Sequence, residues 1–166
     1  MELLIRPVRV EDAADLVDVL NPIIEAGGYT VLDTRFSVDA ERDYLVGFPQ
    51  RGIFHVAERR GDRAVVGCQS IEPFATYTHA CDHVGVIGTF VSLSLRREGI
   101  GRRLSEASFA EAKRKGYEKL FSFVRADNGD ALAFYRGLGF RSIGRASRHA
   151  KIGTQYVDEV IIERFL

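Results

Sequence analysis

The chain has 166 residues, and its 23 basic and 23 acidic side chains cancel to a formal net charge of zero at pH 7. This length suits one domain with a hydrophobic core, and the balanced charge excludes a global field that would attract nucleic acid. The apolar runs are too short to span a membrane, and the N-terminal residues lack a signal-peptide layout. Cys68 and Cys81 lie beside strand patterns, which favours reduced thiols and a cytoplasmic protein. His79 and His83 are four residues apart without a helix to align them, so we expect no metal site.

Apolar periodicity and turn residues predict the elements of the N-terminal half. They are a strand over 3–8, a helix over 11–20, a helix over 37–46, and strands over 53–58 and 64–71. Asn21-Pro22 is expected to end the first helix, and Ser37 is a suitable N-cap for the second. Gly61-Asp62 is typical of a hairpin turn. Residues 21–36 mix apolar side chains with glycines, which fits either a packed loop or a flap that lines a pocket.

The C-terminal half begins with the apolar run 84–95, which we interpret as a central strand buried on both faces. The pattern then predicts a helix over 102–115, a strand over 120–124, a helix over 130–138, and strands over 140–147 and 156–165. The strands before and after the first of these helices form a βαβ unit and should be parallel. We therefore expect a single α/β domain over residues 1–166, of the α+β type, with a mixed, mostly antiparallel sheet of about seven strands and about four helices.

A glycine turn joins the central strand to the following helix, in the sequence Arg96-Arg97-Glu98-Gly99-Ile100-Gly101-Arg102. Glycines let a backbone approach a ligand closely, and the unpaired N–H groups of a helix start attract anions. The turn is not an ATP-binding P-loop, because no Gly-Lys-Ser/Thr follows. It is not a dinucleotide fingerprint either, because Leu104 stands where the third glycine is needed. The turn alone leaves two interpretations open, a phosphate site and a plain turn with solvated arginines.

Two motifs resemble the GNAT superfamily of acyl-CoA-dependent N-acetyltransferases. The Arg-x-x-Gly-x-Gly turn from Arg96 to Gly101 resembles the pyrophosphate-binding motif of that family. Segment 128–140 is similar to its Asn-x-x-Ala-x-x-x-Tyr-x-x-x-Gly-Phe segment, in which Asn128 should bind the pantetheine arm, cap the next helix, or do both. The resemblance implies acetyl-CoA as cosubstrate, bound by Phe90, Val91, Ser92, Leu93, Arg96, Arg97, Glu98, Gly99, Ile100, Gly101, Arg102, Arg103, Leu104, Asn128 and Tyr135.

Acetyl transfer from a thioester to an amine needs a free amine, donors for the oxyanion, and a proton for the thiolate. The resemblance implies Tyr135 as general acid, since a phenol of pKa about 10 can protonate a thiolate whose acid has pKa about 8.5. The helical pattern alone fits a buried aromatic at this position. The resemblance also implies a strand bulge at Thr89, Phe90 and Val91, with the Val91 N–H as oxyanion donor. The family's proline two residues after this valine is Leu93 here.

Four further segments resemble the phosphinothricin acetyltransferase-like branch: Ile5-Arg6-Pro7, Asn21-Pro22, Gly67 to Phe74, and Tyr156-Val157-Asp158. That branch carries a glutamate on the central strand where this chain has Val86, and arginines after the Pro-Phe pair where this chain has residues 75–77. Glu72, His79 and His83 are the substitute candidates for the base, and each also fits an ordinary surface group. The residues expected to contact the acceptor are Tyr29, Phe36, Glu72, Phe74 and His79.

The leading interpretation is an enzyme that acetylates a primary amine by direct attack in a ternary complex, since no cysteine occupies a motif position. The expected acceptor is a small-molecule or amino-acid-like amine, with a protein N-terminus or lysine as the alternative. A non-catalytic acyl-CoA-binding module and a nucleotide-binding module are rivals from other classes; Tyr135 opposes the first, and the absent P-loop lysine opposes the second. Without a carboxylate at Val86, low-pKa amines should be preferred unless Glu72, His79 or His83 compensates. A homodimer is compatible with the sequence.

Overall fold

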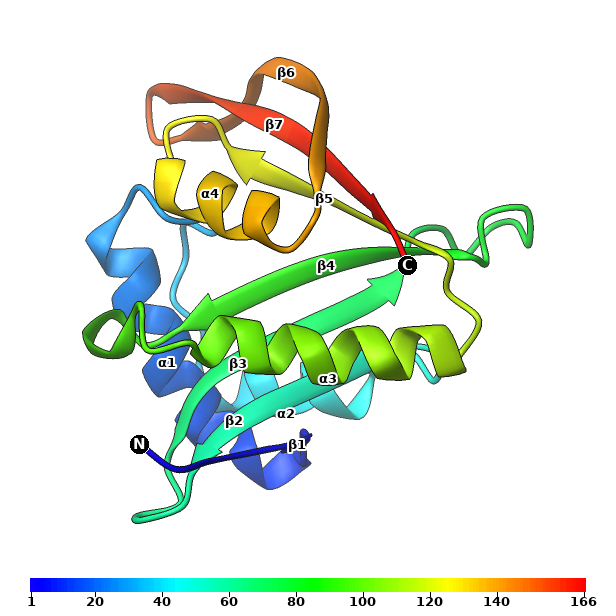
Figure 1. Cartoon of the computed structure of the whole chain (residues 1–166). Helices are drawn as coiled ribbons and strands as arrows, with labels where there is room; N and C mark the ends of the chain where they lie inside the picture. Colours follow the sequence, from blue (N-terminus) through cyan, green and yellow to red (C-terminus); the bar gives the residue numbers. More distant parts are fainter.

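The computed structural model describes all 166 residues, which form a seven-stranded sheet with helices on both faces (Figure 1). The strands are β1 (Leu3–Pro7), β2 (Ile53–Arg59), β3 (Val65–Pro73), β4 (Val84–Val91), β5 (Lys119–Arg125), β6 (Arg141–Ile152) and β7 (Gln155–Phe165). The helices are α1 (Ala13–Ala26), α2 (Val38–Val46), α3 (Ile100–Arg114) and α4 (Gly129–Gly137), with 3₁₀ turns at Val10–Asp12 and Leu93–Leu95. The strand order is β1-β2-β3-β4-β5-β7-β6, and only β4 and β5 are parallel. The predicted fold class is confirmed, as is the parallel pair.

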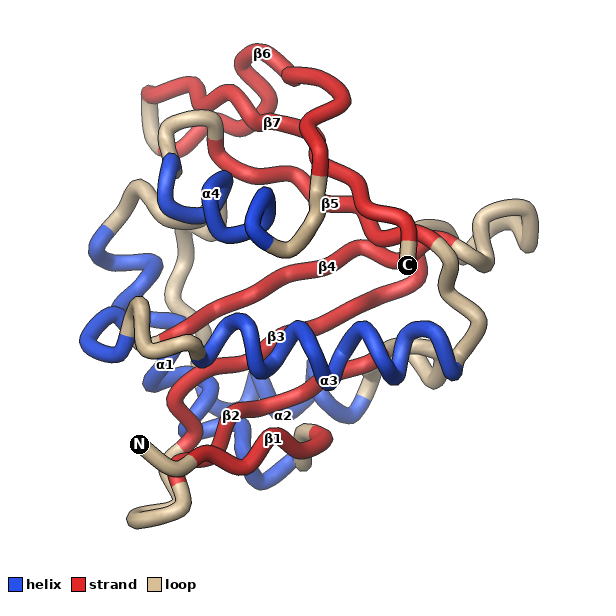
Figure 2. The backbone as a smooth tube through the Cα atoms, in the orientation of Figure 1, coloured by secondary structure: helices blue, strands red, loops and turns tan.

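The parallel strands β4 and β5 stay together only at their beginnings. Their last pair joins Val86 to Phe121, and beyond it residues 87–91 of β4 have no neighbouring strand on this side. Figure 2 shows the two strands diverging toward their carboxyl ends, with α4 beside β5. The Ser122 hydroxyl donates a hydrogen bond of 2.8 Å to the Ile87 carbonyl just past the last pair. The split between β4 and β5 thus leaves a free edge on the central strand.

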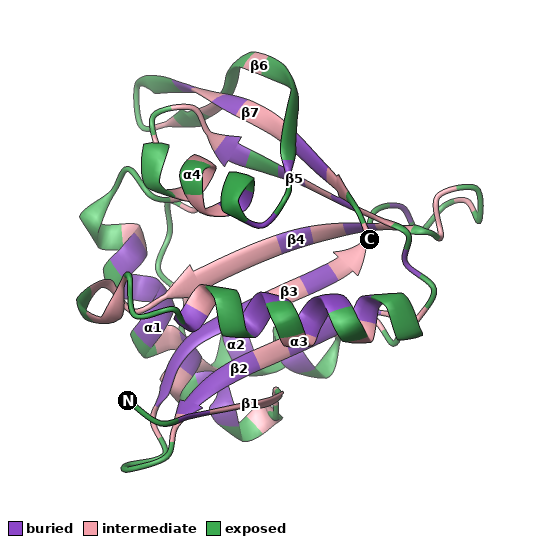
Figure 3. Cartoon of the chain, viewed as in Figure 1, coloured by how far each residue is buried: buried purple, intermediate pink, exposed green.

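Apolar side chains fill both sides of the sheet, since α3 covers one face and α1 and α2 cover the other (Figure 1). The core under α3 and α4 includes Ile71, Ile87, Leu120, Tyr135 and Phe140. The core under α1 and α2 includes Leu16, Leu45, Phe54, Val56 and Cys68. Figure 3 shows the inner stripe of α3 buried and its outer stripe exposed, as expected for an amphipathic helix. The sheet therefore separates two independent apolar layers.

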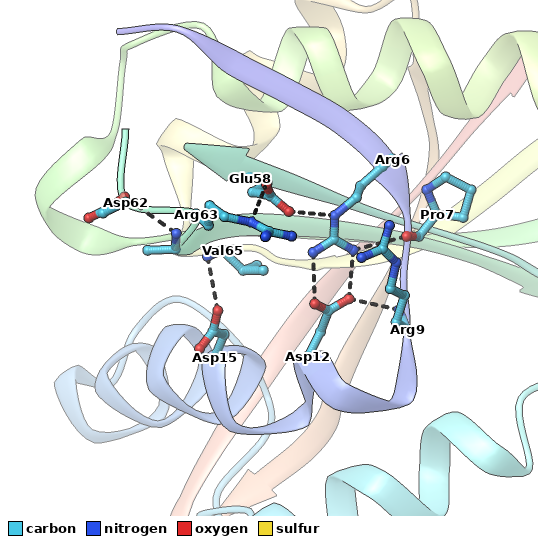
Figure 4. Close-up of polar contacts among 10 residues, drawn as sticks. Arg6, Pro7, Arg9, Asp12, Asp15, Glu58, Asp62, Arg63 and Val65 are labelled. Atoms are coloured by element: carbon cyan, nitrogen blue, oxygen red, sulfur yellow. Dashed lines mark hydrogen bonds and ion pairs between the residues drawn. The ribbon is translucent and has the colours of Figure 1, made fainter. Parts of the chain in front are cut away.

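An ion-pair network ties β1 to β2 and to the start of α1 (Figure 4). Arg6 donates from Nε to Glu58 at 2.7 Å and from its two terminal nitrogens to Asp12 at 2.8 Å. The Asp12 carboxylate also accepts the N–H of Arg9 at 2.7 Å. Burial by itself would raise the pKa of Asp12, but the hydrogen bonds from Arg6 and Arg9 hold that pKa below its ordinary value. The fold therefore stabilises the ionised form of Asp12.

The predicted end of the first helix at Asn21-Pro22 is wrong, because α1 continues through Pro22 to Ala26. Packing outweighs the local signal: Ile23, one residue after the proline, is buried in the continued helix. The buried Asn21 side chain bonds residue 36 instead, accepting the Phe36 N–H at 2.9 Å and donating to the Phe36 carbonyl at 3.0 Å. The helix then ends at Gly27, whose φ is 67°.

The central strand is shorter and more exposed than predicted. β4 ends at Val91, and residues 93–95 form a 3₁₀ turn instead of continuing the strand. Most residues of β4 are only half-buried, so the expected burial on both faces is wrong. The physical reason is the split, because β5 and its helix turn away from the second half of the strand. Other boundaries move modestly: α3 begins at Ile100 and β6 extends to Ile152.

Candidate active site

A pocket of about 540 Å³ lies at the open end of the split, between β4, the start of α3, and α4. Several of the residues expected to bind the cosubstrate line it: Phe90, Val91, Arg96, Arg97, Gly99, Ile100, Gly101, Arg102, Asn128 and Tyr135. Tyr29, which was expected to contact the acceptor, lies in the same lining. Residues far apart in the sequence therefore meet around one cavity.

The other expected cosubstrate residues lie outside this lining: Ser92, Leu93, Glu98, Arg103 and Leu104. The Leu104 side chain is fully buried in a cluster with Leu3 and Ile100. Arg103 turns away from the cavity and donates a hydrogen bond of 2.9 Å to the Leu3 carbonyl. Both positions follow from the helical period, which directs successive side chains of α3 to different sides.

Further residues line the pocket without having been expected there: Ile23, Leu95, Asp130, Ala131, Ala133, Phe134, Gly137 and Leu138. Those on α4 include positions three and four residues from Tyr135, which share a helix face with it. Helical spacing around Tyr135 was thus a usable signal. Ile23 belongs to α1, and only the tertiary fold brings it to the cavity.

The two glycines of the motif are needed for different physical reasons. Gly99 caps α3 with φ at 76°, a left-handed conformation, and a Cβ there would meet no atom within 4 Å. A Cβ on Gly101 would lie 2.9 Å from two ring carbons of Phe134 on α4. Gly99 therefore supplies the left-handed backbone of the turn and leaves open space beside it, whereas Gly101 lets α4 pack closely against α3. The prediction that these glycines let the backbone approach a ligand closely therefore fits Gly99 better than Gly101.

The start of α3 is suited to binding an anion. No side chain caps it, and its first internal bond runs from the Arg103 N–H to the Gly99 carbonyl at 3.1 Å. The N–H groups of residues 100–102 therefore lack partners within the helix and lie at the pocket. Together with the helix dipole they form a positive terminus of the kind that binds phosphate groups.

Arginine side chains surround this helix start in different ways. The Arg96 guanidinium lies over the Tyr29 ring, 3.8 Å from its centroid. Arg97 is largely exposed and has a loose contact of 3.4 Å with Asp130. Arg102 lines the pocket and forms no ion pair. These three arginines can therefore turn toward an anion, whereas Arg103 is held at β1.

The Tyr135 phenol lies inside the pocket and is linked to a buried polar chain. It donates a hydrogen bond of 3.0 Å to Thr89 Oγ1 on β4. The amide nitrogen of Gln69 donates to Thr89 Oγ1 and to Ser105 Oγ, both at 2.9 Å, and Gln69 is fully buried. Burial raises the pKa of Tyr135 to about 12, although its hydrogen bond to Thr89 opposes the shift. The phenol therefore stays protonated throughout the neutral range.

Asn128 occupies the turn before α4 and uses both ends of its amide. Its Oδ1 accepts the Ala131 N–H at 3.1 Å and so caps α4. Its Nδ2 donates to the Tyr29 carbonyl at 3.1 Å. The cap expected from the sequence is present, and the second bond ties the segment before α2 to the rim of the pocket.

The free edge of β4 presents backbone groups toward the split without the expected bulge. The register with β3 runs without a shift from Val91 to Gly85. The Ser92 N–H bonds the Val66 carbonyl of β3 at 3.0 Å, so the alternating groups of Thr89 and Val91 face the opposite way, toward the split. Divergence of β5, rather than a bulge, thus frees the Val91 N–H.

Glu72 lies beside the position where the central strand lacks a carboxylate. Glu72 of β3 is paired in register with Val86 of β4, so their side chains are on the same face. The Glu72 carboxylate accepts a hydrogen bond of 2.6 Å from the Tyr44 hydroxyl on α2. Burial, and then this bond, raise the pKa of Tyr44. The adjacent strand therefore supplies a carboxylate next to Val86.

Of the five candidate acceptor residues only Tyr29 lines the pocket, and Glu72, Phe36, Phe74 and His79 lie outside its lining. Phe74 is exposed and packs edge-on against Phe121, with 5.6 Å between ring centroids. Phe36 is held by Asn21 through its backbone. His79 is fully exposed in the loop after β3 and lies 3.0 Å from the Asp82 carboxylate. The structure thus brings Glu72 and Phe74 to one region of the sheet and leaves His79 at the surface.

Comparison with known proteins agrees with this geometry. Residues 23–140 match the model of the acetyltransferase (GNAT) family. The fold is similar to a ribosomal-protein-alanine N-acetyltransferase from Brucella melitensis, with a TM-score of 0.90, 24% identity, and coverage of 98% of this chain and 99% of that one. It is also similar to an N-acetyltransferase from Staphylococcus aureus Mu50, with a TM-score of 0.89, 21% identity, and coverage of 99% of both chains. The fold is also similar to a phosphinothricin acetyltransferase from Sinorhizobium meliloti in complex with AcCoA, with a TM-score of 0.90, 18% identity, and coverage of 100% of this chain and 89% of that one.

No helix has both the length and the apolar character that crossing a bilayer requires. No three His, Cys, Asp or Glu side chains gather in a way that could hold a metal ion.

Proposed function

Because this chain belongs to the acetyltransferase (GNAT) family, whose cosubstrate is acetyl-CoA, we propose that it acetylates a small primary amine by direct attack in a ternary complex. The observation that carries the proposal is the position of Tyr135. Its phenol lies in the same pocket as the uncapped start of α3, beside the free edge of β4. An anion-binding terminus, a proton donor and free backbone N–H groups are the three parts that acyl transfer from a CoA thioester needs.

The pocket has a suitable place for each part of the cosubstrate. Phosphates fit the free N–H groups of residues 100–102, with Arg96, Arg97 and Arg102 around them. The open space at Gly99 supports this placement, because a side chain there would project from the turn that faces the phosphates. The extended arm of the cosubstrate fits along the free edge of β4, where the backbone groups of Thr89 also face the split and are not used by β3.

Each chemical step has a residue suited to it. The amine nitrogen forms a bond to the thioester carbon, and the Val91 N–H stabilises the oxyanion that develops on the carbonyl oxygen. The C–S bond then breaks, and the departing sulfur takes the phenol proton of Tyr135. The proton lost by the amine passes to Glu72, directly or through water. Solvent restores the protonation states of Tyr135 and Glu72 after product release.

The position of Glu72 changes the expected acceptor preference. The sequence favoured amines of low pKa because Val86 replaces the carboxylate on the central strand. Glu72 stands next to Val86 on the neighbouring strand, so a base is present on the same face. A lysine-like amine of pKa about 10.4 reaches the enzyme as a cation, and a nearby carboxylate can both attract it and accept its proton.

The experiment is a thiol-release assay with acetyl-CoA and primary amines of graded pKa at fixed pH, with wild type and Glu72→Gln. We expect amine-dependent release of CoA, and a loss in Glu72→Gln that grows with amine pKa. His79→Ala is the matched control, since that side chain is fully solvent-exposed and pairs with Asp82. Binding of acetyl-CoA without turnover of any amine would indicate an acyl-CoA-binding module instead. A uniform loss across all amines would remove Glu72 from the role of base.

A further inference from the structure

A row of aromatic side chains crosses the sheet face opposite α3, at the beginning of the split. Phe74 packs on Phe121 with 5.6 Å between centroids, and Phe121 packs on Phe123 with 5.2 Å. Phe123 stacks on the His149 ring at 5.0 Å. Phe74 is 44% exposed and Phe123 is 39% exposed. Contiguous aromatic side chains that are partly exposed in this way are suited to contact a ligand.

The aromatic row begins beside Glu72, the carboxylate that is proposed as the base. Val86 is paired in register with Glu72 on one side and with Phe121 on the other, so these three residues form a line across β3, β4 and β5. Neighbouring strands are about 4.8 Å apart, which places the backbones of Glu72 and Phe121 roughly 10 Å from each other. A molecule with a ring and a short amine-bearing chain has the right length to lie between them.

This face also has negative charge without matching positive charge. Glu72 is bonded by the neutral Tyr44 hydroxyl and forms no ion pair. Glu41, one helical turn before Tyr44 on α2, is buried, and burial raises its pKa and so disfavours its charged form, which leaves Glu72 as the negative group here. The cations that flank the two phenylalanines on the same face of β5 are occupied, because Lys119 pairs with Glu163 at 2.5 Å and Arg125 pairs with Asp127 at 2.8 Å.

We propose that the acceptor of this enzyme is a cationic primary amine that carries an aromatic body and no carboxylate group. The proposal rests on the acetyltransferase function proposed above and specifies its second substrate. The ring would stack on Phe121 and Phe123, and the ammonium group would lie toward Glu72 and Tyr44 before it loses its proton. A carboxylate on the acceptor would find no free arginine beside Phe121 and Phe123 and would be repelled by Glu72.

The first measurement tests the cosubstrate: CoA is titrated into the protein by calorimetry. Phenethylamine is then titrated with and without CoA, so that binding of the amine is measured even if CoA does not bind. The kinetic arm measures kcat/KM for phenethylamine, phenylalanine and propylamine. We expect phenethylamine to bind, and its kcat/KM to exceed both others by about tenfold or more. Failure of CoA to bind would contradict the proposed function, whereas CoA binding without phenethylamine binding would overturn only this inference.

Phe123→Leu is the diagnostic variant, and Phe165→Leu is its matched control. Both phenylalanines are exposed on the sheet, but Phe165 lies at the end of β7, outside the aromatic row. Phe123→Leu should lower kcat/KM for phenethylamine by about tenfold and leave that for propylamine nearly unchanged. Equal effects of the two variants, or a preference for phenylalanine or propylamine, would overturn the proposal. So would a dimer in wild type that Phe123→Leu dissociates without any change in amine selectivity, since a second copy would then be the occupant of this face.

Discussion

The Tyr135 hydroxyl donates its proton to a hydrogen bond with Thr89 Oγ1, at 3.0 Å, across the gap between α4 and β4. Thr89 Oγ1 receives a second bond from the buried Gln69 amide at 2.9 Å. An oxygen that accepts two hydrogen bonds must direct its own proton elsewhere, and Thr89 lines the pocket. The phenol is therefore held by a fixed partner, and a polar chain that reaches β3 sets its direction.

The first prediction concerns the phenol. Tyr135→Phe keeps the ring in its apolar cluster and removes only the hydroxyl. If chemistry limits turnover, kcat should fall by about 10²–10⁴-fold, because the thiolate loses its proton donor. Calorimetry should give an almost unchanged affinity for acetyl-CoA. Turnover close to wild type would mean that water protonates the thiolate.

The second prediction concerns the residue that positions this phenol. Thr89→Val removes the acceptor of the Tyr135 hydrogen bond at nearly constant volume, and kcat should fall about threefold to tenfold, the kinetic equivalent of one neutral hydrogen bond. Thr89→Ser retains the oxygen and should restore most of the rate. Acetyl-CoA affinity should stay constant in both variants. If Thr89→Ser is as slow as Thr89→Val, packing of the methyl group rather than the hydrogen bond is the relevant contribution.

The third prediction separates two arginines of the same motif. Arg96→Ala should weaken CoA binding by about 1–3 kcal/mol, since Arg96 lies at the pocket over Tyr29 and can bond a phosphate. Arg103→Ala removes the same charge, but from a side chain bonded to the Leu3 carbonyl, and its CoA affinity should remain near wild type. Isothermal titration at two salt concentrations measures both variants. Equal losses of CoA affinity in the two variants would show that the net positive charge near the pocket, rather than the position of the Arg96 side chain, determines affinity.

The fourth prediction concerns the contact between the two pocket helices. Gly101→Ala places a methyl group 2.9 Å from the Phe134 ring, so α4 or the ring must move. We expect weaker CoA binding and lower stability by about 1–3 kcal/mol, the usual range for overpacking. Gly101→Ala combined with Phe134→Leu should recover part of the lost stability in thermal unfolding. If the double variant is no more stable than Gly101→Ala, the cost has another origin.

The fifth prediction concerns acid stability. The pKa of Asp12 is below its ordinary value in the folded protein, so its contribution is present above the unfolded pKa and is lost as pH falls through the folded pKa. Asp12→Asn should therefore lower the unfolding free energy at pH 7 by about 1–3 kcal/mol, since it removes charge-assisted bonds to Arg6. Below pH about 4 the difference between the two proteins should shrink. Urea unfolding at a series of pH values measures it, and a constant difference would contradict the assignment.

Local sequence patterns predicted the parts of the site that local geometry forms. The glycine turn and the capping role of Asn128 each depend on neighbouring residues and were found at the expected positions, whereas α3 begins at Ile100, two residues earlier than predicted. Helix boundaries were less predictable where packing decides, as at Pro22, where burial of Ile23 carries α1 onward. The exposure of β4 likewise depends on how far β5 follows it, which no residue of β4 encodes.

Relationships between distant segments could not be obtained from the sequence. The place of Glu72 next to Val86 depends on the register of two strands, and a shift by one residue would turn the carboxylate to the other face. The close contact of Gly101 with Phe134 likewise requires the packing of two helices. Helical spacing could have identified part of the α4 lining. Arg103 shows the opposite case, because it belongs to the motif yet bonds β1 instead of facing the pocket.

The split between β4 and β5 has a consequence for how the molecule opens. Two groups of strands, β1–β4 and β5–β7, share only three ladder pairs, from Val84 with Lys119 to Val86 with Phe121. Parts of a protein that share few backbone hydrogen bonds can open as separate units. A ligand that occupies the split touches both groups, so its binding energy adds to the three ladder pairs and the shared apolar core that hold them together. Amide hydrogens of β5 and α4 should then exchange with solvent more slowly when CoA is bound, while those at the centre of β2 should hardly change.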